Sequence, residues 1–148
     1  MGVWYVNILA IIFATLAGVS TALEAFINGE LGKNTTALIA TFISLLVGTI
    51  FFFINICATG NLKILFNFND INPKLLVGGI LGGLVIYFTV KSMPYLGVSK
   101  TLTLIVVSQI LVGLFIDLNI YKQTMHLYNY IGAILLFIGT FFILNWQI

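Results

Sequence analysis

The sequence is poor in charged residues and in the residues on which metal sites, disulfides and nucleotide sites depend. Its 148 residues contain no arginine, six lysines, four acidic residues, one histidine and one cysteine. The single cysteine, Cys57, excludes an intramolecular disulfide, and His126 has no cysteine or carboxylate neighbours with which to hold a metal ion. No GxxxxGK[ST] loop is present to bind a phosphate. We therefore expect no cofactor, no metal, no nucleic-acid partner and no enzymatic activity.

Apolar residues fill most of the chain instead. They make up 61% of the sequence, and a mean hydropathy of +1.17 indicates that the lipid bilayer is the solvent. Since lipid cannot pair backbone polar groups, each long apolar run predicts a transmembrane α-helix. The runs cover approximately residues 3–27, 36–58, 75–90, 98–116 and 127–144. We predict an all-α integral membrane protein, multi-pass in the cell membrane, in which residues 1–148 form a single transmembrane domain of five helices.

The lysines are divided equally between the two membrane faces that five helices define. The face that carries the N-terminus receives Lys63, Lys74 and Lys122. The opposite face receives Lys33, Lys91 and Lys100. This balance gives the positive-inside rule no preference, so we expect the chain to insert in both orientations. The alternative is a weak bias, with the orientation fixed by a partner chain or an insertion factor.

Five stretches of the sequence, taken in order, resemble a known family. They are LEAFINGELG at 23–32, ISLLVGT at 43–49, VGGILGGL at 77–84, MPYLGVSKTLTLIVVSQILVGLFID at 93–117 and YIGAILLFIGTFFIL at 130–144. This succession is similar to the YdcZ-type branch of the drug/metabolite transporter superfamily over essentially the whole chain. The resemblance implies a five-helix half of a ten-helix inverted-repeat fold, completed by an antiparallel homodimer or by a related chain. It implies no particular substrate.

Ionisable residues within the apolar runs are the first candidates for a transport site. Glu24 shares one face of its helix with Asn28. A carboxylate costs about 2.5 to 3.5 kcal/mol at the centre of a bilayer, and lipid disfavours its charged form, so Glu24 is a candidate for binding a proton or a cationic substrate. In the resembled family a glutamine is expected more often at this point. Near the membrane surface Glu24 would instead be solvated or pair with Lys33, as Asp117 would be solvated or pair with Lys122.

Amide, hydroxyl and aromatic side chains complete the candidate site. Gln109 lies near the middle of its run and offers both a donor and an acceptor. The resemblance implies that Gln109 lines a cavity, and the competing interpretation is a hydrogen bond between helices. Asn28 also matches the family pattern, although it could cap the end of the first helix. Ser44 and Thr41 are expected polar contacts, and Tyr87 is a possible aromatic wall.

Glycines at helical spacing mark two candidate packing surfaces. Two interleaved GxxxG registers are formed by Gly78, Gly79, Gly82 and Gly83. Such residues let another backbone approach closely, either as a rigid seam or as a surface that slides. Gly132 and Gly139 lie a heptad apart and are candidates for a dimer contact, with packing inside one chain as the alternative.

These patterns together predict a secondary transporter. Two oppositely inserted copies would form an inverted repeat of ten helices, which has room for a substrate path. Because the candidate charges are acidic and no nucleotide site is present, we expect proton-coupled export of a small organic metabolite or cation by alternating access. Two other functions stay open: a non-catalytic membrane subunit that completes a hetero-pair with a related five-helix chain, and a lipid flippase.

Dual insertion is directly testable. A single cysteine is engineered near each terminus in a chain in which Cys57 has been replaced, and intact cells are treated with a membrane-impermeant thiol reagent. We expect both terminal cysteines to be labelled within one population of cells. Labelling of only one terminus would show a fixed orientation and would direct the search to an oppositely oriented partner chain.

Overall fold

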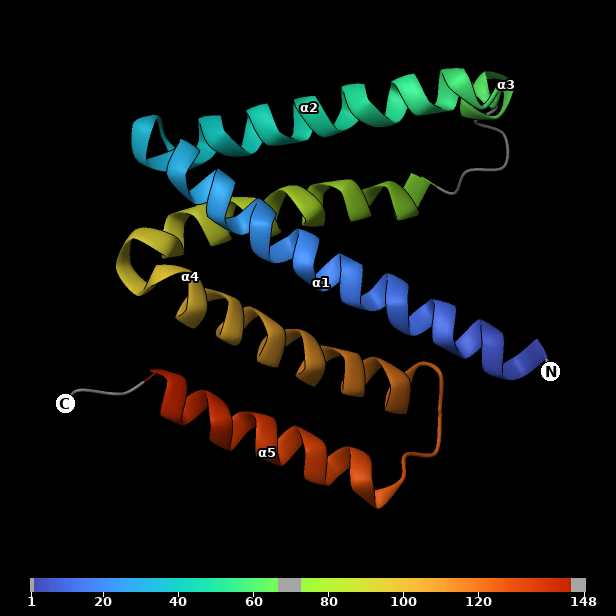
Figure 1. Ribbon diagram of the computed structural model, residues 1–148, viewed down its shortest axis with the longest axis vertical. Helices are drawn as coiled ribbons and strands as arrows, with labels where there is room; N and C mark the ends of the chain where they lie inside the picture. Colours follow the sequence, from blue (N-terminus) through green and yellow to red (C-terminus); the bar gives the residue numbers. More distant parts are fainter. Residues whose placement is uncertain (1, 67–72, 145–148) are drawn as a thin grey trace. The chain divides into compact units, whose positions relative to one another are not determined.

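A computed structural model describes the backbone of residues 2–66 and 73–144, and the side chains of residues 8–66 and 74–144. Within these ranges every assigned element is helical. The elements are α1 (Gly2–Asn34), α2 (Ala37–Ala58), α3 (Leu62–Leu65), the 3-10 helix η2 (Pro73–Leu76), α4 (Val77–Asn119) and α5 (Leu127–Leu144) (Figure 1). The all-α prediction is confirmed for this part of the chain.

Four of these helices, α1, α2, α4 and α5, are long and apolar enough to cross a membrane. Large apolar side chains on them point outward; Phe42 is 65% exposed and Phe137 is 62% exposed. The buried apolar side chains of the described residues are Ala25, Ala40, Val90 and Met93. Because the chain buries so little of its own apolar surface, lipid or a second chain must cover the remainder.

The first helix is longer than the sequence predicted. Its expected end near residue 27 was wrong, because α1 continues to Asn34. The added turns are closed by polar side chains: Asn34 Nδ2 donates to the Glu30 carbonyl at 3.2 Å, and Thr35 Oγ1 donates to the Leu31 carbonyl at 2.7 Å. These bonds satisfy carbonyls that a helix end leaves without intrahelical partners. Thr36 then starts α2, accepting the Ile39 N–H at 3.2 Å.

The helix α4 joins two segments that were predicted to be separated by a loop. Residues 91–97, expected between the runs 75–90 and 98–116, are helical except for Gly97, whose φ of 76° and ψ of 174° interrupt the helix. Positive φ is readily adopted by glycine. Pro94, which lacks a backbone N–H, lies in the turn before this break. The break divides α4 into segments 77–96 and 98–119, each about 30 to 33 Å long and thus comparable with a hydrocarbon core.

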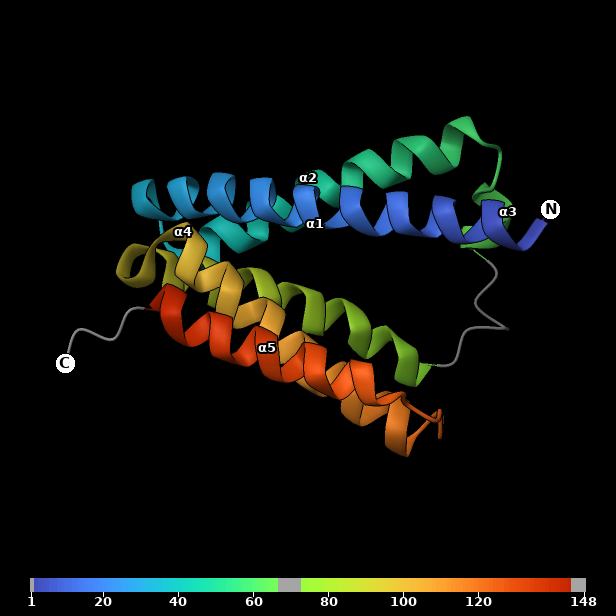
Figure 2. The ribbon, with the colours of Figure 1, turned by 60° about the horizontal axis from the view of Figure 1, so that its bottom comes forward.

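The chain divides into two compact units, Met1–Pro94 and Tyr95–Ile148. In the first unit, α1 and α2 meet at the turn that joins them and splay apart away from it (Figures 1 and 2). In the second unit, α5 runs alongside segment 98–119 of α4 in both views. That residues 1–148 act as a single transmembrane domain stays a prediction.

Two glycines let α1 approach segment 77–96 of α4 closely. A Cβ added to Gly29 would lie 3.0 Å from Met93 Sδ. A Cβ added to Gly32 would overlap Val90 Cγ1. Methionine is flexible and can move, whereas the β-branched valine is stiff, so the contact at Gly32 tolerates no side chain.

We predict that Gly32→Ala destabilises the first unit by about 1 to 3 kcal/mol, because the added methyl group overpacks against Val90. The free energy of unfolding is measured by SDS titration of the purified protein in mixed micelles. Gly18→Ala is the matched control, since nothing lies within 4 Å of a Cβ at Gly18. Adding Val90→Ala to Gly32→Ala should recover part of the loss. Equal stabilities for the two glycine variants would contradict the close packing of α1 on α4.

Candidate functional site

An amide on α1 connects the acidic residue of that helix to α2. Asn28 is only 5% exposed, and its Nδ2 donates to Ser44 Oγ at 3.1 Å and to Glu24 Oε1 at 3.5 Å. Glu24 and Asn28 meet because residues four apart lie on the same face of a helix. The structure thus brings together three of the residues that the sequence singled out, Glu24, Asn28 and Ser44.

A cavity of about 660 Å³ opens beside this cluster. Its walls come from α1, α2, α3 and segment 77–96 of α4. The lining residues are Glu24, Ser44, Leu45, Gly48, Thr49, Phe52, Phe53, Ile56, Leu65 and Ile86. The walls are mainly apolar, with one carboxylate and two hydroxyl groups, and a site of this size and composition is typical of small-molecule binding.

Three features of α2 shape the cavity. Gly48 has nothing within 4 Å of an added Cβ, so the missing side chain leaves space on the cavity side of the helix. The Thr49 hydroxyl donates to the Leu45 carbonyl at 2.7 Å, which leaves its oxygen able to accept a hydrogen bond from a ligand. Phe52 and Phe53 supply aromatic surface, which can bind an apolar body or contact a cation through its ring face.

Two of the alternative interpretations for α1 were wrong. Asn28 does not cap the helix, because α1 continues six residues beyond it to Asn34. Lys33 does not pair with Glu24; it forms an ion pair with Glu30, and both of these side chains are about half exposed. Glu24 is left with the long contact to Asn28 on Oε1, and its Oε2 has no partner among the described residues.

Thr41 and Tyr87 lie outside the walls of this cavity. Thr41 is buried, and its hydroxyl donates to the Ala37 carbonyl at 2.7 Å. Tyr87 is half-buried, and Lys91 Nζ lies 5.7 Å from the centroid of its ring. Ile86, the neighbour of Tyr87, lines the cavity in its place.

Gln109 and Asp117 belong to the second unit. Gln109 is exposed and makes no hydrogen bond within the part of the chain that the structure describes. Burial of an amide in an apolar medium without a partner costs about 2 to 7 kcal/mol, so in lipid Gln109 requires a hydrogen-bond partner beyond the described residues of its own unit. Asp117 is half-buried in the last turn of α4, and it forms no ion pair with Lys122 among the described residues.

The glycine surfaces differ in how much of them the chain itself covers. Gly83 approaches α2, where its added Cβ would lie 3.2 Å from Leu45 Cδ1. The other three glycines of that cluster, Gly78, Gly79 and Gly82, have open space around them. Their packing role therefore stays a prediction.

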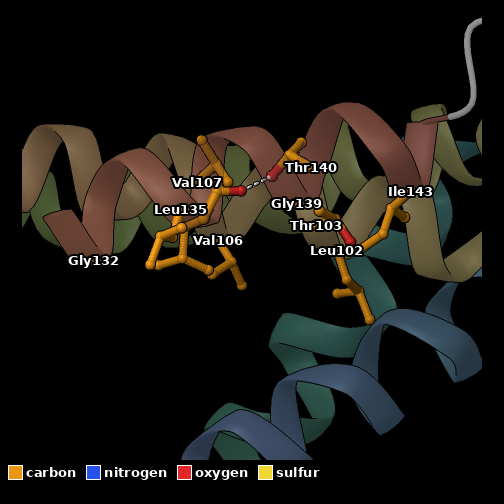
Figure 3. Close-up of a pocket in the computed structure, with 10 residues that line it drawn as sticks. Leu102, Thr103, Val106, Val107, Gly132, Leu135, Gly139, Thr140 and Ile143 are labelled. Carbon is orange, nitrogen blue, oxygen red and sulfur yellow. Dashed lines mark hydrogen bonds between the residues drawn. The ribbon is translucent and has the colours of Figure 1, made fainter.

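Gly132 and Gly139 line a groove of about 570 Å³ between segment 98–119 of α4 and α5 (Figure 3). The groove is lined by Leu102, Thr103, Val106, Val107, Gly132, Leu135, Leu136, Gly139, Thr140 and Ile143. Its two hydroxyl groups donate to carbonyls of their own helices, Thr103 to Ser99 and Thr140 to Leu136. The groove is therefore an apolar surface with no charged group in its walls.

The described residues offer no group of three or more histidine, cysteine, aspartate or glutamate side chains that could hold a metal ion. Cys57 is exposed and free. The site chemistry of the described part thus consists of one carboxylate, one bridging amide, hydroxyl groups and aromatic rings.

Long apolar helices that bury little of their own surface define a multi-pass membrane protein. Residues 9–142 match the sequence profile of the family described as "Putative inner membrane exporter, YdcZ". The chain belongs to the YdcZ family, and it is accordingly a multi-pass protein of the cell membrane, of an exporter class rather than an enzyme class. No curated protein and no solved structure matches it.

We predict that the hydrogen bond from Asn28 to Ser44 couples α1 to α2. In a double-mutant cycle with Asn28→Ala and Ser44→Ala, the coupling free energy of unfolding should be about 0.6 to 2 kcal/mol, the range measured for side-chain hydrogen bonds between membrane helices. A matched cycle pairs Ser44→Ala with Asn55→Ala, because Asn55 bonds only to the Phe51 carbonyl of its own helix. A coupling equal to that of this control would show that the Asn28–Ser44 bond is not formed in the membrane.

Proposed function

We propose that the protein exports a small organic metabolite or cation in exchange for protons, by alternating access in an antiparallel dimer. The observation that carries this proposal is the cavity beside Glu24, in which one carboxylate faces mainly apolar and aromatic walls. The YdcZ family membership supports export as the task.

The proposed exchange of a proton for a cation depends on the single carboxylate of the cavity, Glu24. A protonated Glu24 is neutral and has no electrostatic attraction for a cation, whereas the ionised form attracts one strongly in a low-dielectric site. Proton and cation therefore compete for the same group, and release of one allows binding of the other. Asn28 holds Oε1 and leaves Oε2 for the exchange. Phe52 and Phe53 would contact the apolar body of the substrate.

The dimer is the second part of the proposal. Segments 77–96 and 98–119 of α4 would each cross the membrane, which gives five spans together with α1, α2 and α5. The equal division of the lysines favours two opposite orientations, and two oppositely inserted copies of five spans would give ten helices with an inverted repeat. Thr41 and Tyr87 do not line the cavity of the single chain, so in this proposal they reach the substrate only in the assembled dimer. Gln109, in the second unit, is a further proposed polar contact of the substrate.

We predict that Glu24→Gln abolishes proton-coupled transport, because the amide keeps the shape of the side chain but cannot exchange a proton. Purified protein in liposomes with an acidic interior is tested for uptake of benzyltrimethylammonium, a small aromatic cation that crosses bilayers poorly. Glu30→Gln serves as the matched control, since Glu30 lies outside the cavity and pairs with Lys33. Gradient-driven uptake that survives in Glu24→Gln would remove Glu24 from the mechanism.

A further inference from the structure

The polar groups in the walls of the cavity of the first unit differ in what they can offer a ligand. An ionised Glu24 only accepts hydrogen bonds. The Thr49 hydroxyl gives its hydrogen to the Leu45 carbonyl at 2.7 Å, so toward a ligand it is also an acceptor. The third polar residue of the walls is Ser44, and the other residues that line the cavity have apolar side chains or none. Whether the cavity can donate a hydrogen bond to a cation's other groups therefore depends on Ser44.

The hydroxyl group of Ser44 keeps its hydrogen available. Its Oγ accepts a hydrogen bond from Asn28 Nδ2 at 3.1 Å, and it donates to no acceptor among the described residues. Thr41 on the same helix instead donates to the Ala37 carbonyl at 2.7 Å. A serine hydroxyl has one hydrogen to donate and two lone pairs that accept. The bond from Asn28 thus uses Ser44 as an acceptor and leaves its hydrogen for a ligand.

One amide places this donor beside the carboxylate. Asn28 Nδ2 carries two hydrogens, and the nitrogen lies 3.5 Å from Glu24 Oε1 and 3.1 Å from Ser44 Oγ. The two oxygens can therefore be no farther apart than these two distances combined. A ligand whose cationic nitrogen contacts Glu24 thus has the Ser44 hydroxyl close to the first carbon atoms attached to that nitrogen.

The face of α2 that begins at Ser44 leads to an aromatic residue. Gly48 and Phe52 follow Ser44 at intervals of four residues, and all three line the cavity. Gly48 leaves space, because nothing lies within 4 Å of a Cβ added to it. The helix rises about 12 Å from Ser44 to Phe52, which is enough for a small aromatic amine. This face therefore offers a hydrogen-bond donor at Ser44 and a ring at Phe52.

We propose that the substrate is a cation that carries a hydrogen-bond acceptor, such as a carbonyl group, close to its charged nitrogen, and that Ser44 selects it. The nitrogen contacts Glu24, the acceptor takes the hydrogen of Ser44, and the apolar remainder lies along Gly48 toward Phe52. A cation without the acceptor leaves the donor unpaired in a mainly apolar cavity, which lowers its affinity. The inference rests on the proposed function and names the substrate class of the same site.

The test compares two probes of equal length. They are phenacyltrimethylammonium and phenethyltrimethylammonium, in which a methylene group replaces the carbonyl. Their binding to the purified protein in micelles is measured by titration calorimetry at alkaline pH. We expect the phenacyl compound to bind about 2- to 10-fold more tightly, as one net hydrogen bond provides. Equal binding of the two probes, or tighter binding of the phenethyl compound, would overturn the inference.

Variants of the two hydroxyl residues assign the preference to Ser44. Ser44→Ala should abolish it, because the carbonyl then loses its donor. The ratio of the two affinities is compared, since loss of the bond from Asn28 affects both probes alike. Thr49→Val is the matched control: it removes the other hydroxyl of the cavity, keeps the shape of the side chain and should keep the ratio. A ratio that Ser44→Ala leaves unchanged would overturn the role of Ser44.

A second variant covers the case in which Ser44→Ala does not fold. Ser44→Cys has nearly the size of the serine side chain but is a weaker donor, so it should lower the ratio as well. A ratio equal to that of the unchanged protein would contradict the proposed donor.

The outcomes separate this inference from the proposed function. Proton-driven uptake of benzyltrimethylammonium, together with equal binding of the two probes, would overturn the substrate class alone. Binding with the expected ratio but no proton-driven uptake would overturn the exchange mechanism and support the role of Ser44. Binding of neither probe would overturn both.

Discussion

The inability of lipid to form hydrogen bonds is the constraint on which the rest of this structure depends. It forces the backbone into helices and turns hydroxyl groups back onto their own chains. Hydroxyl groups that donate to the carbonyl four residues earlier are those of Thr15, Thr21, Thr35, Thr41, Thr49, Thr59, Thr89, Ser92, Thr103, Ser108 and Thr140. In the described part of the chain, the bond from Asn28 to Ser44 is the one that joins side chains of two membrane helices. Polar contact between helices is thus concentrated beside the cavity.

One buried threonine lacks a hydrogen bond to the carbonyl four residues earlier. Thr101 is 2% exposed, and its Oγ1 has no hydrogen-bond partner among the described residues. The carbonyl four residues earlier belongs to Gly97, whose non-helical ψ of 174° turns it away from the helical direction. The break in α4 therefore removes the acceptor that every other buried threonine of the described chain possesses.

The sequence predicted the apolar helices well, because hydrophobic runs record contact with lipid directly. It predicted the ends of helices less well. Helix was found where a loop was expected around Pro94. The chain needs no loop to bend there, because Pro94 and Gly97 lie three residues apart and Gly97 interrupts the helix. The residues of the candidate site were likewise predicted only in part. Glu24, Asn28 and Ser44 were predicted because polar groups stand out in apolar runs. Phe52 and Ile86 were missed because apolar residues do not, although Phe52 follows Gly48 at helical spacing. The contribution of Ile86 depends on how α4 lies against the splayed α1 and α2, which no local pattern records.

The candidate site residues are divided between the two units. The first unit contains the carboxylate of Glu24 beside the cavity, and the second contains the amide of Gln109, which has no hydrogen-bond partner among the described residues. A protein whose buried apolar residues include only Ala25, Ala40, Val90 and Met93 among those described has little internal packing to hold one shape.

The break at Gly97 also bears on how the chain is made. The helix α4 that contains it is 43 residues long, and the break is flanked by Lys91 and Lys100. A ribosome working at about 5 to 20 residues per second completes such a stretch in roughly 2 to 9 s, so both segments emerge almost together. The insertion machinery would then receive both segments within one short interval rather than as widely separated spans. The glycine at the break would separate the two segments before α5 is made.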